Sequence, residues 1–571
     1  MYYDSNGNGF ENVTHYLAEE CKKWNPHSLG NLAFLNNLVF IESPTGAGKS
    51  FFIYNYLSDY ARGLKYNILY LVNRKVLKEQ IQEQVSNHVR ELSIAYPYSQ
   101  WYENINVMSY QQLEEMIENS SMIQVVNYLS YNYQYIVADE AHYFLQDSTY
   151  NVKTILSFEA VRQASIPTKI FMSATLEDIK EVIENLVSVK KFNRWMAPEA
   201  SQDPIIWNYA LHKKDEYIRP RVFNSYDELC NIILQGIDEG KWLIFVDNIN
   251  RGKELKENLI KEKVYEESEV VFIDAKYEED EHAYWATKDL IEKSCIKSKV
   301  VIATIVLDNG INFDDMELNN IAIIQDSKTE LIQSLGRKRI SNGEAINLYL
   351  LKGSRLKFEK RLQSAEEHIK LISEFSKYEP EIGTAKMLEK IFNYESIYKC
   401  AKQFLYYNRD KRNLEISFLA RIRWANAVKN YKRILSYFDM YGDEGFIRIQ
   451  EQLLDIDADS AIVDYYISSK QQLMNKVCMK IDEVVDKEMT TAQAIDFKEE
   501  YRKDLLTLFE MYCKEVGKSE EHSPILNNLV KSKDNFTKDM FNIVMTSLGL
   551  SYYMEERHGR GNTKFFTIRK K

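Results

Sequence analysis

The stretch LVFIESPTGAGKSFF, residues Leu38 to Phe52, constrains the fold more than any other part of the chain. Four apolar residues predict a buried strand, and a glycine-containing turn then opens a helix. Gly46 and Gly48 have no Cβ, so successive backbone N–H groups can approach a phosphate closely. Lys49 adds a positive charge for the outer phosphates, and the Ser50 hydroxyl can bind Mg²⁺. A fortuitous turn is disfavoured by the strand before it and the helix after it. The pattern predicts a nucleoside triphosphate site made of Thr45, Gly46, Ala47, Gly48, Lys49 and Ser50.

Length and composition limit the remaining possibilities. A chain of 571 residues is too long for one hydrophobic core and predicts three or four domains. No apolar run is long enough to span a membrane and the polar N-terminus does not resemble a signal peptide, so we expect a cytoplasmic protein. The six cysteines lie scattered, which predicts buried thiols in a reducing compartment. A net charge of −11 argues against a general polyanion binder, so any nucleic-acid surface must be local.

Strands and helices alternate after the phosphate loop, which predicts a parallel sheet with helices on both faces. An amphipathic helix is expected before the loop, from Phe10 to Trp24. The strand at 67–72 ends at Asn73 and Arg74, and the strand at 105–108 ends at Ser109 and Tyr110. Ligands of such sheets bind at the carboxyl ends of the strands, so these four residues could contact a phosphodiester backbone. Each of them is an equally good helix cap.

The strand at 135–138 leads into Asp139, Glu140, Ala141 and His142. Two adjacent carboxylates at a strand end, in the same sheet as a phosphate loop, have a specific use. Asp139 can hold Mg²⁺, and Glu140 can polarise an attacking water as a general base. A solvated acidic turn is the alternative, and the apolar strand that delivers the pair disfavours it. The next strand ends in Ser173-Ala174-Thr175, whose two hydroxyls can bridge the acidic turn to the neighbouring backbone.

Five segments in this part of the chain, SPTGAGKS, LVNRKVLKEQ, VMSYQQL, ADEAH and MSATL, resemble motifs I, Ia, Ib, II and III of superfamily 2 helicases of the DExH type. The resemblance covers nearly all of the first 205 residues, and it departs from the strict pattern at Ser43, where glycine is usual. It implies a RecA-like domain over residues 1–204, ATP and Mg²⁺ as cofactors, and a nucleic acid as partner.

A second alternating pattern begins near Pro204 and predicts a second RecA-like domain over residues 205–353. The strand at 299–304 is followed by IVLDNGINFDD, which resembles motif V. This resemblance implies that Thr304 contacts nucleic acid and that Asp308 and Gly310 couple that contact to ATP. We expect the same coupling role for His142, Ser173 and Thr175 of the first domain.

The segment QSLGRKR, residues 333–339, resembles motif VI. A dissociating γ-phosphate spreads negative charge over its oxygens, and a guanidinium group from a second domain can neutralise that charge. Arg337 is the first candidate for this role, and Gln333 would position the water. The family usually has a second arginine three residues after the first, where this chain has Ile340, so Arg339 and Lys338 are the two candidate substitutes. A basic helix face that binds a structural carboxylate is the alternative.

Helical periodicity dominates residues 354–523, which predicts an accessory helical domain that mostly buries its own apolar stripe and offers a surface to protein partners. Within it, residues 404–433 interleave aromatic side chains with cations such as Arg421 and Arg423. Aromatic rings can stack on bases while cations track phosphates. A helix with core aromatics and solvated charges explains the same pattern equally well.

The last segment, residues 524–571, predicts two helices, at 524–531 and at 537–546 with Thr537 as N-cap, followed by a β-hairpin. This order resembles a winged helix, and Arg560 near the hairpin tip could contact a phosphate backbone. Winged helices also serve as protein contacts.

The motifs together imply an ATP-dependent helicase or translocase. The winged helix favours DNA as its substrate, and the DExH resemblance implies 3′-to-5′ movement. A phage packaging ATPase shares the phosphate loop and the acidic strand end, but the segments resembling motifs V and VI argue against it. The remaining alternative is an ATP-gated nucleic-acid-binding switch or scaffold that does not separate strands.

Overall fold

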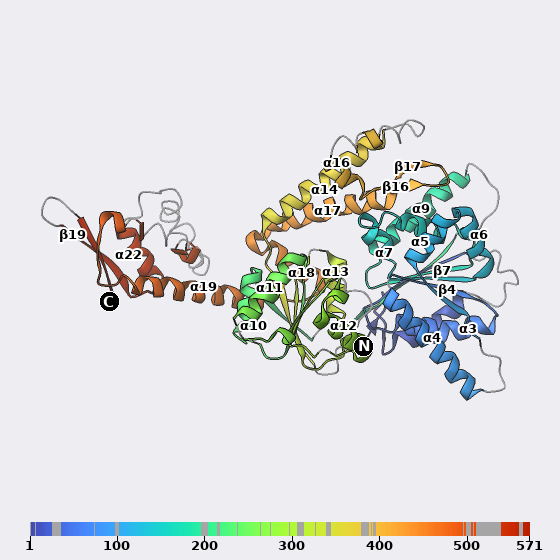
Figure 1. The fold of residues 1–571 in the computed structure, drawn as a ribbon, viewed down its shortest axis with the longest axis horizontal. Coiled ribbons are helices and arrows are strands. Elements are labelled where there is room, and N and C mark those ends of the chain that lie inside the picture. The colour runs from blue at the N-terminus through green and yellow to red at the C-terminus, as the bar shows by residue number, and fades with distance from the viewer. Residues whose placement is uncertain are drawn as a thin grey trace. The chain divides into compact units, whose positions relative to one another are not determined.

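The structure, a computed structural model, describes the chain apart from residues 1, 6, 25–35, 74, 97–101, 196–203, 214–216, 237, 263, 275, 296, 305–312, 326, 339–343, 378–386, 390, 392–394, 495, 498–503, 506, 510–537, 559–563 and 571. The chain divides into two compact units, Met1–Ile456 and Asp457–Lys571. The first unit contains both parallel sheets that the alternating pattern predicts (Figure 1).

The first sheet has six parallel strands in the order β5 (Ile105–Ser109), β4 (Ile68–Val72), β6 (Tyr135–Asp139), β7 (Thr168–Ser173), β3 (Asn37–Glu42) and β8 (Ile205–Ala210). Its strands are buried on both faces: Leu69 and Leu71 of β4 lie in one apolar cluster, and Tyr70 and Val72 lie in another on the opposite face. The sheet extends past the expected boundary at residue 204, because β8 pairs with β3.

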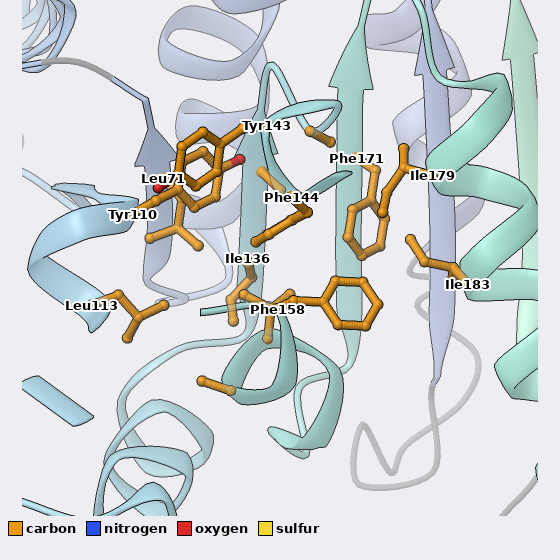
Figure 2. Close-up of a cluster of buried hydrophobic side chains, with 14 of the residues drawn as sticks. Leu71, Tyr110, Leu113, Ile136, Tyr143, Phe144, Phe158, Phe171, Ile179 and Ile183 are labelled. Carbon is orange, nitrogen blue, oxygen red and sulfur yellow. The ribbon is translucent and has the colours of Figure 1, made fainter. Parts of the chain in front are cut away.

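Helices cover both faces of this sheet. One face packs against α5 (Tyr110–Asn119), α7 (Tyr143–Gln146), α8 (Thr154–Gln163) and α9 (Glu177–Trp195), and Figure 2 shows the aromatic and aliphatic side chains of this cluster. The other face packs against α1 (Val13–Glu20) and α4 (Lys75–Ala95), and the phosphate loop leads into α2 (Lys49–Phe51) and α3 (Ser58–Gly63). The first helix is shorter than expected. It begins after Asn12, whose side chain accepts from the N–H of Thr14, while Phe10 lies in a two-residue strand, β2 (Gly9–Phe10).

The second sheet is also parallel, in the order β10 (Ile218–Phe223), β15 (Ile346–Leu351), β14 (Leu318–Ile323), β11 (Lys241–Phe245), β13 (Val300–Ala303) and β12 (Val270–Ile273). It carries α10 (Tyr226–Leu234) and α11 (Ile249–Lys261) on one face, and α12 (Glu281–Lys293) and α13 (Lys328–Leu335) on the other. The two tandem parallel-sheet domains with helices on both faces, followed by a helical region, are confirmed.

The helical region begins with α14 (Arg355–Phe375) and continues through α16 (Glu395–Ala401), α17 (Phe418–Tyr441) and α18 (Gly445–Leu454). Figure 1 shows α14 and α17 side by side, and Phe358 packs against Ile434 and Phe438 between them. We expected the apolar residues of this region to be buried within a helical bundle. The apolar residues at the amino-terminal end of α17 pack against the first domain instead, and Leu419 lies in the core of that domain. Two strands that the sequence pattern did not predict, β16 (Leu405–Asn408) and β17 (Asn413–Ile416), form a hairpin before α17.

The second unit contains α19 (Asp459–Asp482), α22 (Lys538–Ser547) and a three-stranded antiparallel sheet, in which β20 (Lys564–Lys570) pairs with β19 (Tyr552–His558) and β18 (Glu488–Thr490). The expected hairpin is present, and β18 is an additional strand. The helix expected at 524–531 and the N-cap Thr537 lie outside the described residues.

Two expectations from composition can be compared with the structure. No described helix combines the length and apolarity needed to cross a membrane. Cys21 and Cys230 are buried as expected, whereas Cys400 and Cys478 are only partly buried and Cys295, in the turn after α12, is exposed. Cys513 lies outside the described residues.

Candidate active site

The phosphate loop connects β3 to α2. Gly46 and Gly48 have φ angles of 80° and 97°, which L residues with a Cβ rarely adopt. A Cβ on Gly48 would also lie 2.5 Å from Oγ1 of Thr14 on α1, so glycine is required there for space as well. Ser43 is not among the described residues with positive φ, which explains why serine is tolerated at this position.

Several polar side-chain groups of the phosphate loop are buried. Lys49 is 7% exposed, and its Nζ donates to the carbonyl oxygens of Ser43 at 2.6 Å and Pro44 at 3.1 Å. The hydroxyls of Ser43 and Thr45 are buried and have no hydrogen-bond partner within the described part of the chain. A buried hydroxyl without a partner is costly, and a phosphate oxygen would supply the missing partner.

The acidic pair lies beside this loop, at the end of β6. Both oxygens of Asp139 accept a hydrogen bond: Oδ2 from the Tyr70 hydroxyl at 2.6 Å, and Oδ1 from the backbone N–H of Glu140 at 3.1 Å. The Tyr110 hydroxyl donates to the Asp139 carbonyl at 2.8 Å. Burial, and then the charge of Glu140, raise the pKa of Asp139. A neighbouring cation would stabilise the ionised form of this carboxylate.

Glu140 has a φ of 49°, an uncommon conformation for a residue with a side chain and one that recurs at functional sites. Its Oε2 accepts from the Ser173 hydroxyl at 3.2 Å and lies 3.4 Å from Nδ1 of His142. Burial alone would raise the pKa of Glu140, but the His142 contact and the charges of Lys49 and Arg337 lower it. Glu140 is therefore ionised, as a general base must be.

A chain of hydrogen bonds joins Glu140 to the second sheet. The side-chain amide nitrogen of Gln333 lies 3.0 Å from Nε2 of His142, and Nδ1 of His142 lies 2.8 Å from the Ser173 hydroxyl. Ser173 in turn donates to Glu140. All these contacts are satisfied when the His142 proton is on Nδ1. Thr175 extends the link, because its hydroxyl donates to that of Thr329 on α13 at 3.2 Å.

The segment that follows α13 lies against the phosphate loop. A Cβ on Gly336 would be 2.6 Å from Cβ of Thr45, so the absence of a side chain lets the two domains approach closely. Arg337 is 2% exposed, and its charge acts on Glu140. Lys338 donates to the carbonyl of Asp315 at 2.8 Å and forms an ion pair with Glu344. These partners occupy its ammonium group, so Lys338 does not replace the second arginine in this structure. Arg339 lies outside the described residues.

The residues expected to contact nucleic acid differ in their exposure. Asn73 is buried and accepts from Gln111, and Ser109 caps α5 through a reciprocal pair of hydrogen bonds with Gln112. Tyr110 is fully buried and stacks on Tyr143 (Figure 2). In this structure, the side chains of Ser109 and Tyr110 serve the helix and the core.

The other expected contacts are at separate places. Thr304 is buried at the end of β13, where its N–H donates to Ile273. On α17, Arg421 is exposed and Arg423 is partly buried. The remaining expected residues, Arg74, Asp308, Gly310 and Arg560, lie outside the described part of the chain.

Sequence reasoning missed Tyr70, Thr329 and Thr14. Thr329 contacts Thr175, and Thr14 contacts Gly48, through tertiary contacts between segments far apart in the sequence. No local sequence pattern therefore identifies either residue. Tyr70 carries the one hydroxyl in the strand ILYLV, and a polar atom in a fully buried strand needs a partner. That requirement could have marked Tyr70 as a residue that contacts the site.

Comparison with known proteins gives one family match. Residues 18–178 are similar to the family described as Type III restriction enzyme, res subunit. This range includes the phosphate loop, the acidic pair and Ser173. No curated protein matches the chain.

Similar solved structures include S. cerevisiae Dbp5 bound to RNA and ADP BeF3, at 14% identity and a TM-score of 0.39, over 58% of this chain and 82% of that one. Mycobacterium smegmatis helicase Lhr bound to ssDNA and AMP-PNP matches at 12% identity and a TM-score of 0.41, over 74% of this chain and 61% of that one. Escherichia coli DEAH/RHA helicase HrpB matches at 12% identity and a TM-score of 0.39, over 97% of this chain and 65% of that one. At these scores the matches carry no argument about activity. The family match covers residues 18–178 and therefore describes similarity over most of the first domain.

Proposed function

We propose that this protein is a nucleic-acid-dependent ATP hydrolase of the DExH type that moves along a strand as its two sheet domains open and close. The observation that carries the proposal is the convergence of both domains on one phosphate loop. Gly336 lies against Thr45, Gln333 contacts His142, and the charge of Arg337 acts on Glu140.

Each group has a defined task in hydrolysis. The loop N–H groups from Thr45 to Ser50 and the ammonium group of Lys49 hold the phosphates, which displaces Lys49 from the loop carbonyls. Ser50 and Asp139 would hold Mg²⁺, which would neutralise phosphate charge. Glu140 accepts a proton from water while the water oxygen bonds to the γ-phosphorus and the bond to the β-phosphate oxygen breaks. Arg337 stabilises the charge that develops on the γ-phosphate, and Gln333 orients the water through the shared network.

The network gives hydrolysis a mechanical consequence. ATP favours the closed arrangement because Arg337 is attracted to the γ-phosphate, and loss of that phosphate removes the attraction. His142, Ser173 and Thr175 would transmit the change between the sheets, together with Asp308 and Gly310. Each sheet then grips the nucleic-acid backbone in turn.

We propose DNA as the substrate and 3′-to-5′ as the direction. On α17, Arg421 and Arg423 would contact phosphates through their side chains. Asn73, Arg74 and Thr304 would contact the backbone at strand ends. The turn at Ser109 and Tyr110 would approach the backbone without its two hydroxyls, because the Ser109 hydroxyl accepts from the Gln112 N–H and the Tyr110 hydroxyl donates to the Asp139 carbonyl. Arg560 would add a contact from the second unit.

The test is the rate of ATP hydrolysis with no nucleic acid and with single-stranded and duplex DNA and RNA of one matched sequence. We expect single strands to stimulate the rate, DNA more than RNA, and Lys49→Ala to abolish it. Hydrolysis that no nucleic acid changes would contradict the proposal. A directional unwinding assay decides the polarity, and robust hydrolysis without strand displacement would favour an ATP-gated switch.

A further inference from the structure

Tyr70 is the central residue of β4 and pairs with Val137 of β6. Asp139 follows Val137 by two residues at the end of β6. The Tyr70 side chain is fully buried, and its hydroxyl donates to Oδ2 of Asp139 at 2.6 Å. The Ser50 side chain lies next to this hydroxyl. A tyrosine hydroxyl carries its proton near neutral pH and a carboxylate can only accept, so Tyr70 is the donor in its hydrogen bond with Asp139.

The groups beside Tyr70 suit a magnesium ion. A serine hydroxyl and a carboxylate are oxygen ligands of the kind Mg²⁺ prefers, and the Tyr70 phenol donates to the carboxylate. Among the described residues, no group of three or more His, Cys, Asp or Glu side chains forms a metal cage. This fits Mg²⁺, which usually takes one or two protein oxygens and completes its shell with phosphates and water.

We propose that Tyr70 is a positioning residue that holds the Asp139 carboxylate in place for a metal bound beside Ser50. This inference rests on the proposed function. Two donors, the Tyr70 hydroxyl and the Glu140 N–H, fix the orientation of the Asp139 carboxylate, one on each oxygen. Each oxygen keeps a second lone pair for a cation or its bound water. Partners of this kind orient metal ligands, and their loss typically weakens metal binding about 10- to 100-fold.

A purely structural role for Tyr70 makes a different prediction. The other residues of β4 are Ile68, Leu69, Leu71 and Val72, so phenylalanine would satisfy the packing of this strand. If the hydroxyl did no more than fill a hydrogen-bonding need in the core, its loss would lower stability and leave metal affinity unchanged.

The experiment compares Tyr70→Phe with the wild-type chain, because this change removes one hydroxyl and keeps the ring. Tyr349→Phe is the matched control: Tyr349 is a buried tyrosine on β15 whose hydroxyl contacts Asp238, away from the phosphate loop. Mn²⁺ binding in the presence of AMP-PNP is measured by electron paramagnetic resonance. Affinity for AMP-PNP in excess EDTA is measured in parallel.

We expect Mn²⁺ affinity to fall about tenfold in Tyr70→Phe, with metal-free AMP-PNP affinity unchanged and Tyr349→Phe like wild type. The Mg²⁺ concentration for half-maximal hydrolysis rises by the same factor, and excess Mg²⁺ restores the rate. Unchanged Mn²⁺ affinity in Tyr70→Phe, or an equal fall in Tyr349→Phe, overturns the inference. If the wild-type chain hydrolyses no ATP, the proposed function fails, and the Mn²⁺ titration still decides the role of Tyr70.

Discussion

Gly336→Ala tests whether the close approach of the two sheet domains is needed for catalysis. Gly336 has φ −68° and ψ −6°, so alanine can adopt its backbone conformation without strain. The added Cβ would lie 2.6 Å from Cβ and 2.7 Å from Oγ1 of Thr45. Ordinary carbon contacts lie near 3.5–4.0 Å, so the second domain must retreat from the phosphate loop by about 1 Å.

A displacement of this size has a calculable consequence. Overpacking costs about 1–3 kcal/mol, which corresponds to about a five- to 150-fold loss of rate if it opposes only the closed state. A 1 Å misplacement of catalytic groups can cost about 100-fold, which lies within the same range. We therefore expect Gly336→Ala to lower the kcat of ATP hydrolysis about 100-fold and to leave the thermal stability of the chain nearly unchanged.

Two comparisons isolate the cause. Gly63→Ala on α3 is the matched control, because a Cβ there meets no atom within 4 Å. In a Thr45→Gly background both Thr45 atoms are absent and only the Ile332 carbonyl oxygen, at 3.3 Å, stays close to the added Cβ, so Gly336→Ala should have little further effect on the steady-state rate. Wild-type hydrolysis by Gly336→Ala, or an equal loss in the Thr45→Gly background, would refute the reasoning.

Three further predictions concern the base, the core and an ion pair. Glu140→Gln should lower single-turnover hydrolysis by at least about 100-fold while ATP binding, followed by equilibrium titration, is retained, and unchanged hydrolysis would exclude Glu140 as the base. Leu419→Ala should destabilise the first domain by about 2–5 kcal/mol in urea unfolding, because Leu419 of α17 is fully buried in that domain's core, and a change below 1 kcal/mol would contradict this packing. Burial alone would raise the pKa of Asp247, but the charges of Lys357 and Arg361 and hydrogen bonds from Lys357 and Tyr226 lower it. The ionised carboxylate therefore stabilises the folded chain at pH values above the unfolded pKa, which is about 4. This stabilisation is lost as the pH falls through the lower, folded pKa. Asp247→Asn should therefore melt at a lower temperature than wild type at pH 7, with a difference that shrinks as pH falls below about 4, and a difference independent of pH would be evidence against the ion pair.

The fold was predictable from the sequence where local patterns determine structure. The strand before the phosphate loop, the strand before Asp139 and the alternation in the second domain all carry runs of apolar residues bounded by polar turns. Such runs mark strands of parallel sheets, because both faces of those strands are buried. The left-handed angles of Gly46 and Gly48 follow from the same local signal.

The features that were missed depend on contacts between distant segments. The edge strand β8 pairs with β3 across more than 160 residues of sequence, so its membership of the first sheet has no local mark. The hairpin of β16 and β17 packs against the first domain: Tyr406 lies against its apolar cluster, and Arg409 donates to the carbonyl of Glu118. Tyr110 was expected at the ligand edge, but its ring lies in the core and only its hydroxyl reaches Asp139. In each case tertiary contacts, and not local propensity, decide the outcome.

Arg337 is the central residue of the proposed mechanism, because it must act from the second domain on a triphosphate held by the first. The most direct measurement is the single-turnover rate of ATP hydrolysis by Arg337→Ala with saturating single-stranded DNA, beside the affinity of the same variant for AMP-PNP. An arginine in this role contributes about 10³- to 10⁵-fold to kcat, so the rate should fall by at least about 1,000-fold while nucleotide binding changes little. Hydrolysis at the wild-type rate by a variant that binds nucleotide normally would contradict the account.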